Sequence, residues 1–225
     1  MKTLNRYLHE PINTLTHLIA AVASLLGLIL LLILTVDDLP KMISLLIYGL
    51  SMIILYTASS LLHGVKTRPR YQFWLNRLDH MAIFLLIAGT YTPIAYNLFT
   101  DWWRWGTLIV VWSITGLGMA YKLLCRHIHG FINTSIYLLL SWGICLPILL
   151  FSNLLHILPT HGLILITLGG LIYSLGYVIY YTERPDPWPQ VFGHHEIWHL
   201  FVMGGSLCHF LFMLLIIVPF EEALL

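Results

Sequence analysis

Long apolar segments follow one another along the whole chain, and they constrain the fold more than any other feature. There are seven, at residues 15–36, 42–62, 78–98, 107–124, 132–151, 162–181 and 195–220. About 20 apolar residues in a helix cross a bilayer, and the short connections, such as 37–40, contain aspartate and proline. Backbone groups in lipid must be satisfied within each segment, which favours helices. The sequence therefore predicts an all-α integral membrane protein with seven transmembrane helices, forming one domain over residues 1–225 with a short cytoplasmic N-terminal segment, 1–14.

The composition excludes several classes of protein. Only 9% of the residues are charged, against roughly 25% in soluble domains. The net charge of +1 gives no basic surface for nucleic acid, so the expected partners are membrane lipids. The three cysteines are isolated within apolar sequence, which indicates packing residues and not a disulfide framework.

Lysine and arginine are distributed unevenly between the two predicted sides of the membrane. With seven crossings, the side of the N-terminus has nine of these residues, namely Lys2, Arg6, Lys66, Arg68, Arg70, Arg77, Lys122, Arg126 and Arg184. The other side has only Lys41 and Arg104. Because cytoplasmic loops carry the excess of positive charge, we expect the N-terminus in the cytoplasm and the C-terminus outside.

Polar residues gather at the predicted cytoplasmic ends of four helices. The groups lie at residues 10–17, 59–63, 78–80 and 194–199, so the topology brings them to one membrane depth. His195 and His199 are spaced i, i+4 and share one helix face. Together with His63 they make three histidines from two helices, the ligand count of a catalytic zinc site with one open position. Zn²⁺ is the predicted cofactor, although ligand type alone also allows copper or nickel.

Two carboxylates compete for the role of general base. Asp79 is an ionisable residue just inside a membrane helix, which is functional by default, although it could also cap the helix at the interface. It could take a proton from water at the metal, while the Ser59 hydroxyl holds that water or donates to an oxyanion. Residues 195–199 also match the pattern H-E-x-x-H, in which the glutamate is the base of zinc proteases. Glu196 is therefore the second candidate base.

A polar stripe precedes and enters the first helix. Glu10 and Asn13 begin the stripe and His17 continues it, which suggests support of the metal ligands by hydrogen bonding. Capping of the helix towards solvent explains the same residues equally well. The remaining histidines near these groups, for which direct ligation is not expected, are His80, His194 and His209.

These segments together resemble the hemolysin III family, the bacterial branch of the progestin and adiponectin receptor (PAQR) group. The matching stretches are residues 10–17, 59–63, 78–80, 88–93 (AGTYTP) and 194–210 (HHEIWHLFVMGGSLCHF). The resemblance implies a seven-helix fold with the N-terminus inside and zinc near the cytoplasmic face. It also implies that His63, His195 and His199 are the ligands, with Asp79 and Ser59 around water at the metal.

The resemblance suggests a function as well. The receptor members are similar to alkaline ceramidases, so we expect a zinc-dependent hydrolase of an acyl lipid, with an amide or ester substrate and a role in membrane homeostasis. The expected location is the bacterial plasma (inner) membrane. One alternative is a non-enzymatic sensor or receptor in which zinc is structural. A weaker alternative, suggested by the family name, is a pore-forming haemolysin.

Overall fold

The computed structural model describes residues 8–125, 130–151, 154–189 and 191–221. Part of the predicted segment 1–14, and three charged residues of the orientation count (Lys2, Arg6 and Arg126), lie outside the described residues. The helices in chain order are α2 (Pro11–Leu34), α3 (Leu39–Gly64), α4 (Pro69–Leu98), α5 (Asp101–Leu124), α6 (Gly130–Phe151), the short α7 (Leu154–Ile157), α8 (Thr160–Thr182) and α9 (His194–Phe212), which continues as the π-helical turn η1 (Met213–Ile217).

The helices have the length and composition of membrane spans. Six of them, α2, α3, α4, α5, α8 and α9 with η1, are long and apolar enough to cross a bilayer. The predicted crossing at 132–151 corresponds to α6, whose apolar part at Ser135–Leu150 is shorter. The prediction of an all-α membrane protein is confirmed, and the number seven is approximate.

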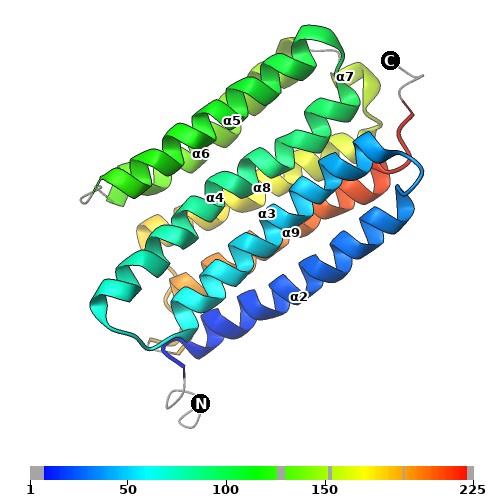
Figure 1. Cartoon of the computed structure of the whole chain (residues 1–225). Coiled ribbons are helices and arrows are strands. Elements are labelled where there is room, and N and C mark those ends of the chain that lie inside the picture. Colours follow the sequence, from blue (N-terminus) through cyan, green and yellow to red (C-terminus); the bar gives the residue numbers. More distant parts are fainter. Residues whose placement is uncertain (1–7, 126–129, 152–153, 190, 222–225) are drawn as a thin grey trace.

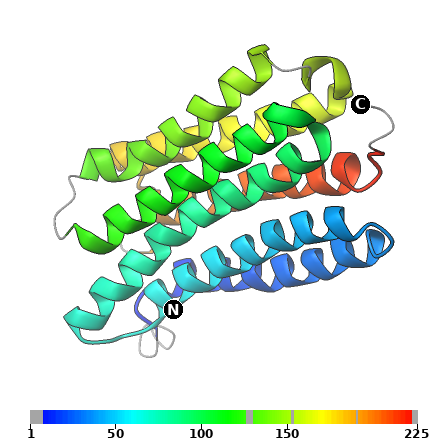
Figure 2. The ribbon, with the colours of Figure 1, turned by 45° about the horizontal axis from the view of Figure 1, so that its top comes forward.

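The long helices lie side by side in one bundle (Figures 1 and 2). Contacts join α2 to α3, α3 to α4, α4 to α5, α8 to α9 and α2 to α9. The α3–α4 connection and the start of α2 lie at one end of the bundle, whereas η1 ends at the opposite end (Figure 1). We call the first of these the basic end, because the connection carries Lys66 and Arg68. The positive-inside prediction assigns the basic end to the cytoplasm.

Proline residues mark where several helices begin. Proline stands in the first turn of α2, α3 and α4, where its missing N–H leaves no helical hydrogen bond unmade. Helix α4 begins at Pro69, nine residues before the predicted segment at 78. The prediction followed apolar residues only, whereas the first turns of this helix are polar. The sequence predicted that Asp79 and His80 stand at the start of this helix. In the structure they lie about three turns inside it.

The core sits between α2, α3, α4 and the C-terminal end of α9. Tyr48, Phe212 and Met213 are fully buried there. Helices α3 and α4 approach closely at Gly89, where an added Cβ would lie 2.8 Å from the Cβ of Ser51. Small residues permit such close approach in membrane helices. This contact fixes the two helices that carry His63, Ser59 and Asp79.

Candidate metal centre and cavity

Three histidines from two helices converge at the basic end. His63 lies in the last turn of α3, and His195 and His199 lie in the first turns of α9. One ring nitrogen of each lies within 4.8 Å of the other two. The ring centroids form a nearly equilateral triangle, with separations of 5.0 Å for His63–His195, 4.8 Å for His63–His199 and 5.0 Å for His195–His199. One ion between them could therefore be reached by all three side chains.

Glu10 orients the ring of His63. The Nδ1 atom of His63 lies 2.7 Å from Oε2 of Glu10, and the backbone N–H of Glu10 donates to the His63 carbonyl at 2.8 Å. The hydrogen bond with His63 is the largest cause that lowers the pKa of the Glu10 carboxyl to about 2. An ionised Glu10 accepts from Nδ1–H, which leaves Nε2 of His63 as the nitrogen with a lone pair for a metal.

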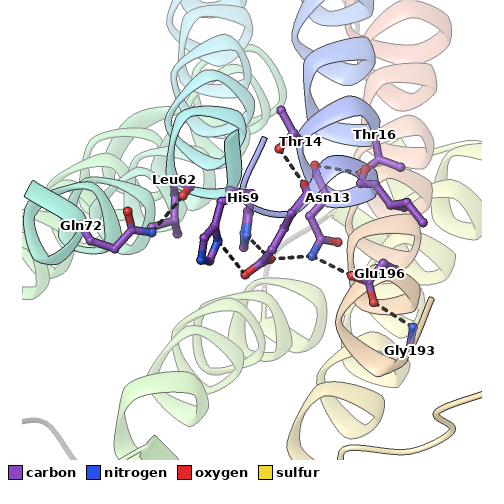
Figure 3. A network of polar contacts seen from close by, with 11 residues as sticks. His9, Asn13, Thr14, Thr16, Leu62, Gln72, Gly193 and Glu196 are labelled. Carbon is purple, nitrogen blue, oxygen red and sulfur yellow. Dashed lines mark hydrogen bonds and ion pairs between the residues drawn. The ribbon is translucent and has the colours of Figure 1, made fainter. Parts of the chain in front are cut away.

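Asn13 connects the starts of α2 and α9. Its Nδ2 group donates to Glu10 Oε2 at 2.8 Å and to Glu196 Oε1 at 2.9 Å. The other oxygen of Glu196 accepts the backbone N–H of Gly193 at 2.8 Å, which caps the first turn of α9. Figure 3 shows Asn13 and Glu196 pointing toward each other, with Gly193 beside Glu196. One carboxylate oxygen of Glu196 thus joins α9 to α2, and the other caps the start of α9.

His17 packs directly on a member of the triad. Its ring is stacked on that of His199, with centroids 3.7 Å apart and planes inclined by 10°. His17 is 4% exposed, and neither of its ring nitrogens has a hydrogen-bond partner among the described residues. The three residues of the predicted stripe, Glu10, Asn13 and His17, therefore all contact a histidine of the triad or the network beside it.

Asp79 and Ser59 lie across from the histidines. The carboxyl group of Asp79 on α4 lies beside the Ser59 hydroxyl on α3. Ser59 is 3% exposed and stands one helical turn before His63. Both side chains line the same cavity as the three histidines. The structure thus brings together the residues predicted as ligands and two of the three predicted catalytic residues, while Glu196 is turned toward Asn13.

The cavity extends from the triad into the bundle. Its volume is about 430 Å³, which is within the usual range for small-molecule sites. Near the basic end it is lined by Gln72, Asn76 and His80. The side chain of Gln72 donates to the Leu62 carbonyl at 3.0 Å (Figure 3). Deeper in the bundle the lining is mainly apolar and includes Leu55, Ile83, Leu86, Ile87, Ile94, Leu138, Leu149 and Ile166.

The three histidines not expected to be ligands occupy different places. His80 lines the cavity and His209 lines its deeper part, whereas His194 lies outside it. None of the three belongs to the group of histidines whose ring nitrogens could share one metal ion.

Sequence reasoning missed a row of cavity tyrosines on α8. Tyr173, Tyr177 and Tyr180 all line the cavity, and the ring of Tyr180 packs at 5.6 Å against His195. Their spacing, i, i+4 and i+7, is that of one helix face. This spacing was a signal in the sequence that could have located them.

The residues at the triad fit a metal ion. The ring of His199 is 2% exposed, and one of its nitrogens lies within 4.8 Å of a ring nitrogen of His63 and of His195. Three imidazoles from two helices are also a donor set that suits zinc and other transition metals.

Comparison with known proteins shows the family to which the chain belongs. Residues 5–210 match the family described as "Haemolysin-III related". "Hemolysin-3" of Bacillus cereus is 33% identical over 224 residues, covering 97% of each chain. The "Hemolysin-3 homolog" of Bacillus subtilis is 34% identical, covering 94% of this chain and 96% of its own. The human "Monocyte to macrophage differentiation factor" is 28% identical, covering 88% of this chain and 80% of its own. The chain belongs to the haemolysin-III related family of membrane proteins.

Proposed function

We propose that this protein is a zinc-dependent hydrolase that cleaves an amide or ester bond of an acyl lipid. We place it in the bacterial plasma membrane with the basic end in the cytoplasm. One observation carries the proposal: the three histidines, together with Asp79 and Ser59, line the end of a cavity whose deeper walls are mainly apolar. Such a cavity suits a lipid whose polar bond lies at the histidines and whose chain extends into the bundle.

The residues that would hold the metal are His63, His195 and His199. Zinc is the proposed ion because it is commonly bound in catalytic sites by three protein ligands with one open position. When bound, it supplies Lewis acidity and makes water a usable nucleophile near neutral pH. Glu10 supports this role by accepting a hydrogen bond from Nδ1 of His63, as outer partners of metal-bound histidines commonly do.

Asp79 is the proposed general base. Its carboxylate accepts a proton from the attacking water, whose oxygen forms a bond to the acyl carbon of the lipid. The bond from that carbon to nitrogen or oxygen then breaks, and the proton held by Asp79 passes to the leaving amine or alkoxide. The products are a fatty acid and an amine or alcohol, and Asp79 returns to its ionised form. The Ser59 hydroxyl lies beside the carboxylate of Asp79 and would orient it for this transfer.

Glu196 suits this role less well. Its two oxygens already accept hydrogen bonds from Asn13 and from the backbone of Gly193. A base must have a lone pair within reach of the proton that it removes. We therefore assign Glu196 to holding α2 and α9 together.

The test compares Asp79→Asn with a matched control. Purified protein is assayed for bound zinc and for release of fatty acid from a panel of acyl amides and esters. The control is Asp37→Asn, because Asp37 is an exposed carboxylate after α2. We expect Asp79→Asn to retain zinc and to lose on the order of 100-fold or more in turnover, with the control unchanged. Lipid profiles of cells with and without the gene identify the substrate.

A sensor with a structural metal is the alternative that the geometry also supports. The ligands come from α3 and α9, so a metal would fasten these two helices at one end. A structural metal needs no general base, so Asp79→Asn would then leave both the metal and the cellular function nearly intact. A pore has less support, since it rests on the family name and on the presence of polar residues within the membrane helices.

A further inference from the structure

A second polar point lies deep in the cavity, far from the triad. His209 on α9 lines the cavity together with Tyr173 on α8. His209 follows His199 by ten residues on the same helix, which places it about 15 Å further along the helix axis. Neither residue takes part in the hydrolysis proposed above. Apolar residues such as Ile166 on α8 also line this part of the cavity.

The fold makes room for both rings. A Cβ at Gly169 would lie 2.8 Å from Nε2 of His209, and one at Gly205 would lie 2.7 Å from Cδ2 of Tyr173. Two positions on α8 and α9 must therefore lack a side chain for the two polar rings to fit. Ionisable side chains within membrane helices are costly and commonly mark functional sites.

Hydrogen bonds hold the two rings in place. The hydroxyl of Tyr173 lies 2.7 Å from Oγ of Ser206, which also accepts from the Tyr56 hydroxyl at 2.6 Å. The ring of His209 lies beside the backbone of Ile166 and packs at 5.7 Å from that of Tyr173. An imidazole has two ring nitrogens and can bond a partner through each. His209 can therefore bond a polar group that enters the cavity.

We propose that His209 recognises a hydroxyl or carbonyl group in the middle of a long acyl chain, about 15 Å from the triad. This proposal rests on the proposed function, because it takes an acyl lipid as the occupant of the cavity. A plain hydrocarbon chain would cover the polar edge of His209 without pairing it, which is unfavourable. A chain with a hydroxyl at this level pairs it. The preferred substrates are then acyl lipids that carry a polar substituent at mid-chain.

The test uses two fatty acids that differ only in one mid-chain hydroxyl, oleic acid and ricinoleic acid. Both are product-type ligands and are not consumed. Dissociation constants are measured by native mass spectrometry on the purified, zinc-supplemented full chain in detergent. We expect wild-type protein to bind ricinoleic acid on the order of fivefold more tightly than oleic acid. His209→Leu is expected to remove this preference and to keep the affinity for oleic acid.

Two further variants control the result. His161→Leu replaces an exposed histidine at the start of α8 that does not line the cavity, and should keep the preference. His209→Gln retains a donor and an acceptor and should keep part of it, which covers the case in which His209→Leu does not fold. Equal binding of the two acids by wild type, or a preference that persists in His209→Leu, overturns the inference but leaves the proposed hydrolase standing. Failure to bind either acid counts against both.

Discussion

The ring of His17 on α2 lies flat against the ring of His199 on α9, with centroids 3.7 Å apart. Both side chains are almost completely buried, with exposed fractions of 4% and 2%. The ring nitrogens of His17 have no hydrogen-bond partner in the described residues, so His17 acts on His199 through packing. The stack therefore fixes the ring plane of one proposed ligand, His199, by a contact from a different helix.

Replacement of His17 is expected to weaken metal binding according to the shape of the new side chain. His17→Ala removes the ring and should lower zinc affinity by roughly tenfold, the low end of the effects seen for outer partners of metal ligands. His17→Phe keeps an aromatic ring and should retain most of the affinity. The measurement is competition for zinc against a chelator of known affinity. Equal losses in both variants would indicate that a nitrogen of His17, and not its packing, supports the site.

Removal of two proposed ligands should abolish stoichiometric zinc. His195→Ala combined with His199→Ala leaves one imidazole of the triad, which is too few for a stable zinc site. His194→Ala is the matched control, because His194 stands beside the pair in sequence but lies outside the cavity. Zinc is counted by elemental analysis of purified protein. Full zinc content in the double variant would refute the catalytic and the structural reading of the site together.

Glu196→Gln separates the two candidate bases. Glutamine keeps a carbonyl oxygen that can accept from Gly193 or Asn13, so the junction of α2 and α9 should persist. Turnover should then fall by no more than about threefold, whereas loss of a general base costs 100-fold or more. The assay is fatty acid release, run beside Asp79→Asn. A loss in Glu196→Gln as large as that in Asp79→Asn would restore Glu196 as the base.

Much of the fold was predictable from the sequence, because lipid forces apolar segments to form helices. The segments at 42–62 and 162–181 correspond closely to α3 and α8. Helix α4 was harder to predict, since Arg70 and Arg77 lower the hydropathy of its first turns. In the structure Arg77 is buried, donates to the carbonyls of Leu123 and Cys125 and packs over the ring of Phe73. A charged residue can thus continue a helix when the end of a neighbouring helix supplies acceptors.

The site was predictable where spacing within a helix decides which side chains meet. The i, i+4 pair His195 and His199 is such a case. The partner of Glu196 was not predictable, because Asn13 lies 183 positions away and their contact depends on how α2 and α9 pack. The same holds for the stack of His17 on His199. Contacts between helices need the packing itself, which the sequence pattern does not specify.

The close contact between α3 and α4 gives a final prediction. An added Cβ at Gly89 would meet the Cβ of Ser51 at 2.8 Å and the carbonyl oxygen of Ile47 at 3.4 Å. Gly89→Ala must therefore push the two helices apart, and overpacking of this kind costs about 1–3 kcal/mol. We expect the midpoint of thermal unfolding in detergent to fall by on the order of 5 °C.

Gly116→Ala on α5 is the matched control, since no heavy atom lies within 4 Å of its added Cβ, and its midpoint should not fall. Zinc content should survive in Gly89→Ala, because the proposed ligands lie on α3 and α9 and not on α4. Turnover should decline, because Ser59 and Asp79 are paired across the same two helices that the new methyl group separates. Equal midpoints for the two alanine variants would show that the α3–α4 contact tolerates a methyl group, and the expected loss of turnover would then have no structural basis.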